Sequence, residues 1–321
     1  MNFVNLKYFM AVVQEMSFSK AAQKLYLSQQ ALSGHIHRLE EECGTQLFER
    51  SPKLRLTYAG VCVAKHAAQI LDLEEQMVVQ LSDIANLRSG HLSVGTSHTR
   101  GRVLLPDIIP AYLNRYPTIE LTMHTGITQE LEGMLIDGSL DLLVGFPPFH
   151  SQSIQCIPVR KERLCLVVPK SLMAQKFANP DGAAAHFMRS GVDIAAFCDM
   201  PFVMMKRGRV HDMAFRYFSS HNITPNIILQ HSDLETLLGL CLHGAGLTFS
   251  FESSARKAIM MSEQNKADAA YLFFFQDSSM ETELVIAYNN DRYLSRAAND
   301  FILLAQEVFT PDFPSHMKRA D

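Results

Sequence analysis

The chain has 321 residues, which is enough for two or three domains. Hydrophobic residues make up 47% and charged residues 19%, so the chain can form an apolar core and lacks the composition of a disordered protein. No segment approaches the roughly 18 apolar residues of a membrane span, and the first residues do not have the pattern of a signal peptide. We therefore expect a cytoplasmic protein without a membrane partner.

The net charge of −4 is unevenly distributed. Residues 1–60 carry seven Lys or Arg and five Glu, a net of +2, which leaves −6 to the rest of the chain. A mildly basic head on an acidic body fits a chain in which only one module contacts nucleic-acid phosphates.

Residues 1–57 are predicted to form a small helical domain that ends in a hairpin. Apolar residues at helical spacing indicate three helices, with Phe9 in the first, Ala21 and Ala22 in the second and Ile36 in the third. Ser28 is a suitable N-cap for the third helix. Two short alternating segments then flank Ser51-Pro52-Lys53, which predicts a basic β-hairpin wing.

The third helix has the composition of a DNA recognition helix on its polar face. Glutamine can form a bidentate pair with adenine, and serine can bond base edges or phosphate. Such contacts lie in the first turn of recognition helices. An ordinary solvated helix face has a similar composition. The prediction of DNA binding therefore depends on the order of the elements, in which three helices are followed by a wing. The candidate DNA-binding residues are Ser28, Gln29, Gln30, Ser33, His37, Arg38, Arg50, Lys53 and Arg55.

Residues 3–60 resemble the DNA-binding domain of LysR-type transcriptional regulators. The shared motifs include Ser17-Phe-Ser-Lys-Ala-Ala22, Leu27-Ser-Gln-Gln-Ala-Leu-Ser33 and Leu47-Phe-Glu-Arg50. The resemblance implies a winged helix-turn-helix that binds double-stranded DNA through Gln29, Gln30, Ser33 and the wing, with RNA polymerase as a further partner. The family usually has proline at position 30 and a basic or long residue at position 34. Gln30 and Gly34 therefore make the family's sequence preference unsafe to transfer.

Residues 58–90 are predicted to form a linker helix and a hinge. A run from Thr57 to about Arg88 has a heptad pattern of apolar residues interrupted by one glutamate: Val63, Ala67, Ile70, Glu74, Met77, Leu81 and Ile84. The sequence Leu87-Arg-Ser-Gly90 is expected to be the hinge. Packing of this helix on its own body is the alternative. The family resemblance implies self-association through this helix as a dimer or tetramer.

Residues 91–309 are predicted to form an effector-binding domain, and residues 310–321 a tail. Apolar strands alternate with helices, which indicates a parallel sheet covered on both faces. The pattern occurs twice, which suggests two lobes around a cleft: lobe I (91–163 and 269–309) and lobe II (164–268). Tyr271–Phe275 is expected to be the first strand that returns to lobe I. The predicted fold class is therefore α/β: a winged helix-turn-helix, a long linker helix and a two-lobed domain that resembles the periplasmic-binding-protein-like effector domain of the same family.

Ligands of such domains bind at the carboxyl ends of strands and at helix N-termini. The candidate effector-binding residues are Ser97, Thr99, Arg100, Thr125, Thr128, Phe146, Lys206, Arg207 and Thr248. The resemblance implies a ligand role for Ser97 and Thr99, and helix capping is the alternative for each hydroxyl. Hydroxyl donors with positive charge favour a small carboxylate or oxyanion as the effector. The alternatives are an apolar ligand, or cations that point to solvent.

The sequence contains no catalytic motif of the GxSxG, HExxH, Walker or GxGxxG type, so an enzyme is not expected. No metal or cofactor is expected, because none of the six cysteines has CxxC or zinc-ligand spacing. Cys156 and Cys165 are the only close pair. Two alternatives to an effector-controlled regulator follow: a thiol-based redox-sensing regulator on the same frame, and a pure small-molecule binding protein.

Overall fold

The structure is a computed structural model that describes residues 2–51, 53–85, 90–264 and 270–309. The chain divides into two units, residues 1–87 and 88–321, and each has its own apolar core. Among the described residues, no helix is both long and apolar enough to cross a bilayer.

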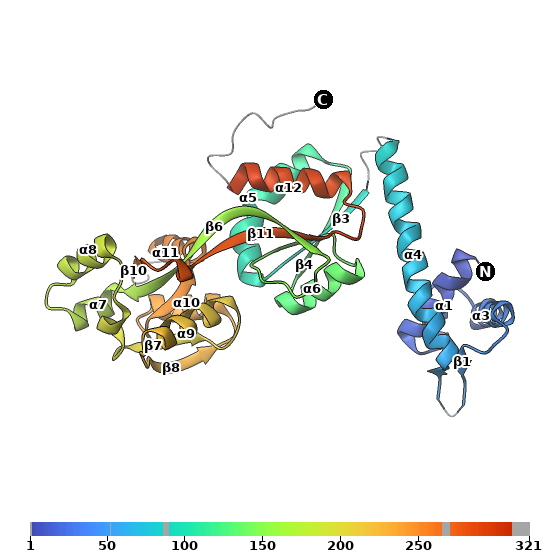
Figure 1. Ribbon diagram of the computed structural model, residues 1–321, viewed down its shortest axis with the longest axis horizontal. Helices are drawn as coiled ribbons and strands as arrows, with labels where there is room; N and C mark the ends of the chain where they lie inside the picture. The colour runs from blue at the N-terminus through green and yellow to red at the C-terminus, as the bar shows by residue number, and fades with distance from the viewer. Residues whose placement is uncertain (1, 52, 86–89, 265–269, 310–321) are drawn as a thin grey trace. The chain divides into compact units, whose positions relative to one another are not determined.

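The first unit contains three short helices, a hairpin and a long helix (Figure 1): α1 (Phe3–Glu15), α2 (Phe18–Lys24), α3 (Gln29–Cys43), β1 (Phe48–Glu49), β2 (Arg55–Leu56) and α4 (Tyr58–Ile84). Side-chain caps set the helix starts, because Ser17, Ser28 and Thr57 each accept a hydrogen bond from a backbone N–H of the first turn. Gly44 ends α3 at a φ of 66°, which a glycine adopts without strain.

The long helix α4 packs in part on its own unit. Ala67 is buried in the core of the first unit, and Glu74 forms an ion pair of 3.0 Å with Lys7 of α1. Packing on the helix's own body is therefore correct for these residues. From Ile70 onward, large apolar side chains are exposed on α4: Ile70, Leu73, Met77, Val78 and Leu81. The helix ends at Ile84, earlier than expected. Of the expected hinge at residues 87–90, residues 87–89 lie outside the described residues, and Gly90 is the first residue of strand β3 (Gly90–Thr96).

Lobe I of the second unit contains three parallel strands, the antiparallel strand β11 and three helices. They are β3 (Gly90–Thr96), α5 (His98–Arg115), β4 (Ile119–Thr125), α6 (Thr128–Asp137), β5 (Leu142–Gly145), β11 (Glu281–Asn289) and α12 (Arg296–Phe309). Strand β3 pairs in parallel with both β4 and β5. The carboxyl ends of these three strands therefore lie at one edge of the sheet, where α5 and α6 begin.

Lobe II repeats the alternation of strands and helices: α7 (Lys170–Lys176), α8 (Pro180–Ser190), β7 (Pro201–Met205), α9 (Arg209–Ser220), β8 (Asn226–His231), α10 (Leu234–Leu242), β9 (Thr248–Phe251), α11 (Glu252–Gln264) and β10 (Ala270–Phe274). The sequence pattern predicts no secondary structure for residues 170–200. In the structure, this stretch contains α7, α8 and a short 3-10 helix. Their aromatic residues pack together, with the Phe187 ring centroid 5.1 Å from that of Phe197 and 5.5 Å from that of Phe273.

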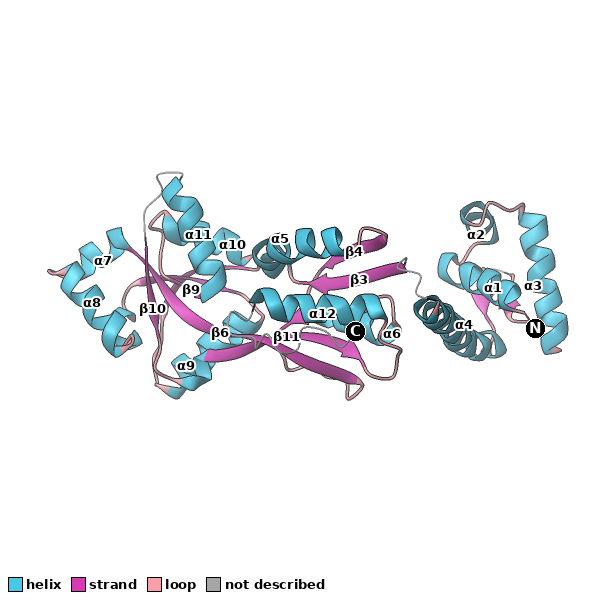
Figure 2. Ribbon diagram, turned by 90° about the horizontal axis from the view of Figure 1, so that it is seen from above, coloured by secondary structure: helices cyan, strands magenta, loops and turns pink. Residues whose placement is uncertain are grey.

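One long strand, β6 (Ile154–Pro169), joins the two lobes (Figure 2). Its first part pairs with β11, and its last part pairs with β9 and β10. Two sequence expectations are corrected here. The sequence favours a strand only over Leu164–Pro169, because the charged residues 160–163 interrupt the apolar pattern. The strand near Tyr271 stays in lobe II as β10, because it pairs with Cys165–Pro169.

Helix α5 begins at His98, eight residues before Pro106, the position at which the sequence favours a helix start. Pro106 lies inside the helix and has no N–H to donate to the carbonyl of Arg102. The Nζ of Lys257 in α11 donates to that carbonyl at 2.5 Å instead. A contact from lobe II therefore replaces the hydrogen bond that the proline removes.

Candidate DNA-binding surface and effector site

The polar face of α3 is exposed as expected for a recognition helix. Gln29 and Gln30 are exposed and Ser33 is partly exposed, all in the first two turns. The hydroxyl of Ser19 in α2 donates to Oε1 of Gln29 at 2.8 Å. This bond orients the Gln29 amide before any ligand is bound, so less side-chain entropy is lost on binding.

The rest of this face is open to a partner. A Cβ at Gly34 would meet no atom within 4 Å, so the glycine is not required by packing within the first unit. Arg38 is exposed, and His37 is exposed and lies 3.3 Å from Glu41. Ser28 has a structural role, because its hydroxyl caps α3 by accepting from Ala31 N. A direct contact from Ser28 to DNA would therefore be additional to its capping bond.

The predicted wing is present as an antiparallel pair in which Phe48 faces Leu56 and Glu49 faces Arg55. Lys53 and Arg55 are exposed, and no ion pair to either is seen among the described residues. Arg50 differs, because its guanidinium lies 3.4 Å from the buried carboxylate of Glu40. The wing therefore offers two free cations and one that is already engaged.

Two helix N-termini meet at the edge of lobe I. Ser97 caps α5 by accepting from Arg100 N at 3.4 Å, so its structural role is confirmed. Gly126 N, at the end of β4, donates to Thr96 O at 3.2 Å and ties the two strand ends together. Helix α6 has no side-chain cap, since its N-cap residue is Ile127 and Thr128 is the first residue of the helix. The expectation that Thr128 caps α6 is therefore wrong, and the first N–H groups of α6 have no side-chain acceptor at the cap.

Arg100 is a cation enclosed at this edge. Its Nη1 donates to Val144 O at 3.3 Å, and its guanidinium lies 4.5 Å from the ring centroid of Phe146. Burial lowers the pKa of Arg100 to about 10, although the negative charge of Glu162 favours the protonated form. Arg100 is therefore charged at neutral pH, and no described carboxylate forms an ion pair with it. Arg100 is partly exposed and makes no direct ion pair among the described residues, so an anion that reached its guanidinium could pair with it directly.

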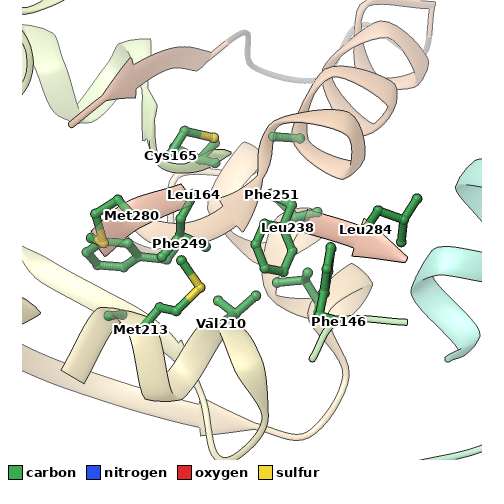
Figure 3. Close-up of a cluster of buried hydrophobic side chains, with 14 of the residues drawn as sticks. Phe146, Leu164, Cys165, Val210, Met213, Leu238, Phe249, Phe251, Met280 and Leu284 are labelled. Atoms are coloured by element: carbon green, nitrogen blue, oxygen red, sulfur yellow. The ribbon is translucent and has the colours of Figure 1, made fainter. Parts of the chain in front are cut away.

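The space between the lobes is closed by aromatic and aliphatic side chains. Phe146 is only 6% exposed, and its ring centroid lies 4.4 Å from that of Phe251. Figure 3 shows these two rings beside Leu284 of β11, with Val210 and Leu238 of lobe II close by. The side chain of Phe146 thus spans from the end of β5 in lobe I to the core of lobe II.

The basic residues of lobe II are arranged differently from the sequence expectation. Lys206 and Arg207 are exposed in the turn after β7. Arg209, at the start of α9, was not singled out, although it belongs to the same basic run. Its Nη2 donates to Thr282 Oγ1 at 3.4 Å, whereas its buried Nε has no partner among the described residues. Burial and the neighbouring Arg216 lower the pKa of Arg209.

The hydroxyl-bearing candidates do not all lie at this edge. Thr99 is partly buried in the first turn of α5, and Thr125 is exposed at the end of β4. The expectation that Thr248 follows a strand is wrong, because Thr248 is the first residue of β9. It pairs with Val167 and is 0% exposed.

A buried carboxylate holds the loop that carries Phe146. Glu132 of α6 accepts hydrogen bonds from the backbone N–H of His150 and of Ser151, and its Oε2 lies 3.1 Å from Nδ1 of His150. Burial opposes ionisation of this carboxyl, but the hydrogen bonds from His150 and Ser151 outweigh it. The pKa of Glu132 therefore lies below its usual range.

Glu132→Gln is expected to lower the stability of the second unit by about 1–3 kcal/mol at pH 7, because an acceptor of three hydrogen bonds is replaced. Because the folded-state pKa is depressed, this contribution is present above the usual carboxyl pKa of about 4.3 and is lost as the pH falls through the folded-state value. Urea unfolding of the full chain between pH 7 and pH 3 measures it. Glu120→Gln, at an exposed position of β4, is the control. A difference from wild type that stays constant over this range would contradict the role assigned to the Glu132 charge.

The cysteine pair that suggested redox sensing is separated by the fold. Cys156 and Cys165 both lie on β6, nine residues apart, so their Cα atoms are about 30 Å apart at about 3.3 Å per residue. A disulfide needs Cα atoms within about 7 Å. Desolvation also raises the pKa of both thiols, which makes them weak nucleophiles.

The two units match two family models. Residues 3–61 match the bacterial regulatory helix-turn-helix protein, lysR family, and residues 85–310 match the LysR substrate binding domain. A winged helix-turn-helix followed by a two-lobed binding domain defines a transcription regulator controlled by an effector. The chain belongs to the LysR family of transcription regulators. It is therefore a DNA-binding regulator rather than an enzyme, and the alternative of a pure binding protein is wrong.

Known proteins resemble the chain over nearly its whole length. It is 26% identical to the probable RuBisCO transcriptional regulator of Cyanidium caldarium over 92% of this chain and 90% of that protein. It is also 26% identical to the uncharacterized regulator YcgK of Bacillus subtilis, over 96% and 95%. Among solved structures, a full-length OxyR variant from Pseudomonas aeruginosa has a TM-score of 0.68 at 22% identity and 96% and 94% coverage. CbnR in complex with its target DNA has a TM-score of 0.60 at 21% identity and 96% and 100% coverage, and both structures bear on the fold alone.

Proposed function

We propose that this regulator is controlled by a small carboxylate or oxyanion that binds at the edge of lobe I, against Arg100 and the N-terminus of α6. The observation that carries the proposal is the enclosed guanidinium of Arg100, which has a carbonyl and an aromatic ring as neighbours but no described carboxylate as a counter-ion. An anion at this place would pair directly with the guanidinium.

Two further features support an anion. The uncapped N-terminus of α6 directs backbone N–H groups and partial positive charge toward the end of β4, beside Thr125 and Thr128. In lobe II, the buried Nε of Arg209 lacks an acceptor among the described residues. One anion that binds a cation from each lobe would favour the arrangement in which the two lobes are close together. Only in that arrangement do both cations reach the ligand. Thr99, Lys206 and Arg207 would form the rim of this site.

Thermal unfolding of the full chain against matched acids, amines and neutral analogues tests the proposal. A ligand at a hundredfold excess over its Kd adds about 2.7 kcal/mol, which is roughly 5–10 °C for a unit of this size. We expect stabilising compounds to be acids. Arg100→Gln and Arg209→Gln should each abolish the shift, whereas Arg216→Gln, at an exposed arginine of α9, should retain it. Stabilising compounds that are neutral or cationic, or an acid whose effect survives Arg100→Gln, would overturn the proposal.

The remaining partners follow from the family. We propose that Gln29, Gln30, Ser33, His37 and Arg38 face double-stranded DNA, with Lys53 and Arg55 on its phosphates. The chain would act as a dimer or tetramer in the cytoplasm, where its DNA is, and would act on RNA polymerase. Support for the DNA contacts comes from the exposure of the α3 face and of both wing cations.

A further inference from the structure

The carboxylate of Glu40, near the end of α3, is buried beneath the wing. Its side chain is only 8% exposed. Oε1 accepts hydrogen bonds from Leu47 N at 2.8 Å and from Phe48 N at 3.2 Å, where the chain enters β1. A buried charge is tolerated only when hydrogen bonds or an opposite charge compensate it. The recognition helix is thereby joined to the first strand of the wing.

Arg50 supplies the opposite charge from the other end of β1. Its Nη2 lies 3.4 Å from Oε2 of Glu40, and its guanidinium lies 5.4 Å from the ring centroid of Phe18 in α2. The Phe18 ring in turn packs edge-to-face on Phe48, with centroids 5.7 Å apart. Arg50 therefore contacts α3 and α2 at the point where the chain leaves β1 for the wing tip.

We propose that Arg50 is a positioning residue for DNA binding: held by Glu40 and Phe18, it sets the wing against the recognition helix so that Lys53 and Arg55 meet phosphates. The sequence motif alone counts Arg50 among the DNA contacts. In the structure its charge is already engaged by a buried carboxylate, whereas Lys53 and Arg55 have no described counter-ion. Removing the charge of Glu40 therefore has opposite effects on DNA affinity, depending on whether Arg50 contacts DNA or positions the wing.

If Arg50 bound phosphate directly, Glu40→Gln would free its charge and remove a negative charge near DNA, so binding would tighten. If Arg50 positions the wing, Glu40→Gln loosens the wing and binding weakens. Glu41→Gln is the matched control, since it makes the same change of net charge at an exposed position one residue away. We expect Glu40→Gln to weaken binding roughly tenfold and Glu41→Gln to leave it unchanged or slightly tighter.

The experiment uses the full chain and a duplex selected by it from a random-sequence pool, with affinity measured at several salt concentrations. The binding constant K falls as salt rises, and each lost phosphate contact makes the slope of log K against log salt less steep by about 0.9. Without Arg50 the wing must be ordered on binding but still reaches the phosphates in the complex, so Arg50→Ala is expected to weaken binding roughly tenfold with an unchanged slope, whereas Lys53→Ala lowers the slope. The double variant Glu40→Gln/Arg50→Ala should bind no worse than Arg50→Ala, because both act through one contact. A slope reduced by Arg50→Ala, or tighter binding by Glu40→Gln, overturns the proposal.

Arg50→Lys keeps the test valid if Glu40→Gln does not fold. Lysine retains the charge and binds phosphate well, so a direct contact would survive the change almost intact. Lysine lacks the planar group that stacks on Phe18 and pairs with Glu40. We therefore expect Arg50→Lys to lose most of the affinity that Arg50→Ala loses, with the same salt slope as wild type. Near-wild-type affinity of Arg50→Lys would show that Arg50 contacts DNA directly.

Discussion

Leu81→Glu is expected to halve the mass of the assembled protein in light scattering. Leu81 belongs to an exposed apolar stripe on α4 between residues 70 and 81, together with Ile70, Leu73 and Met77. Val63 and Ala67 of the first half pack on the core of their own unit, whereas the residues of the stripe stay exposed. A stripe of this length on a helix is typical of pairing with a second helix, and a carboxylate within it would have to be desolvated.

Loss of the pair should also be visible in DNA binding. Two linked recognition helices gain affinity for a two-half-site duplex through their effective concentration, so we expect Leu81→Glu to lose about 10²–10⁴-fold on such a duplex. Binding to a single half-site should be unchanged. Ala68→Glu adds the same charge at an exposed position on the opposite side of α4 and should retain the assembly. If Leu81→Glu retains the wild-type mass, the chains associate through another surface.

Gln29→Ala and Ser33→Ala are expected to lose discrimination between DNA sequences, by roughly 1–3 kcal/mol for each lost base contact. Both side chains lie on the exposed face of α3, and Ser19 already orients the Gln29 amide. Gel shifts with the selected duplex and with point-substituted duplexes measure the effect. Ser19→Ala should give a smaller loss in the same direction, because Gln29 then has to be ordered on binding.

The wing cations provide the contrast. Lys53→Ala and Arg55→Ala should weaken binding to all sequences alike and lower the salt slope by about 0.9 for each lost phosphate contact. Retained discrimination in both Gln29→Ala and Ser33→Ala would show that bases are read elsewhere. A salt slope unchanged by Lys53→Ala would show that the wing does not reach the phosphates.

The sequence by itself determined the elements whose stability is local. The recognition helix could be predicted between Ser28 and Gly44, because a capping hydroxyl and a glycine at positive φ act on the nearest turn of backbone. The wing was recognisable from the turn residues between two short alternating segments. The ends of β3 and β4 could also be located, because the apolar strand pattern stops at the polar turns that begin at Ser97 and Gly126.

Only the tertiary structure decided which distant groups meet. Glu40 reads as one of three surface glutamates in a row, and its burial follows from the return of the chain at Leu47 and Phe48. Arg100 could be named, but its enclosure by Val144 and Phe146 depends on the neighbouring strand β5. The charged half of β6 has no strand signal of its own, because the partner strand β11 lies about 120 residues later in the chain. Burial and pairing of this kind depend on three-dimensional contacts, so no local pattern of residues reports them.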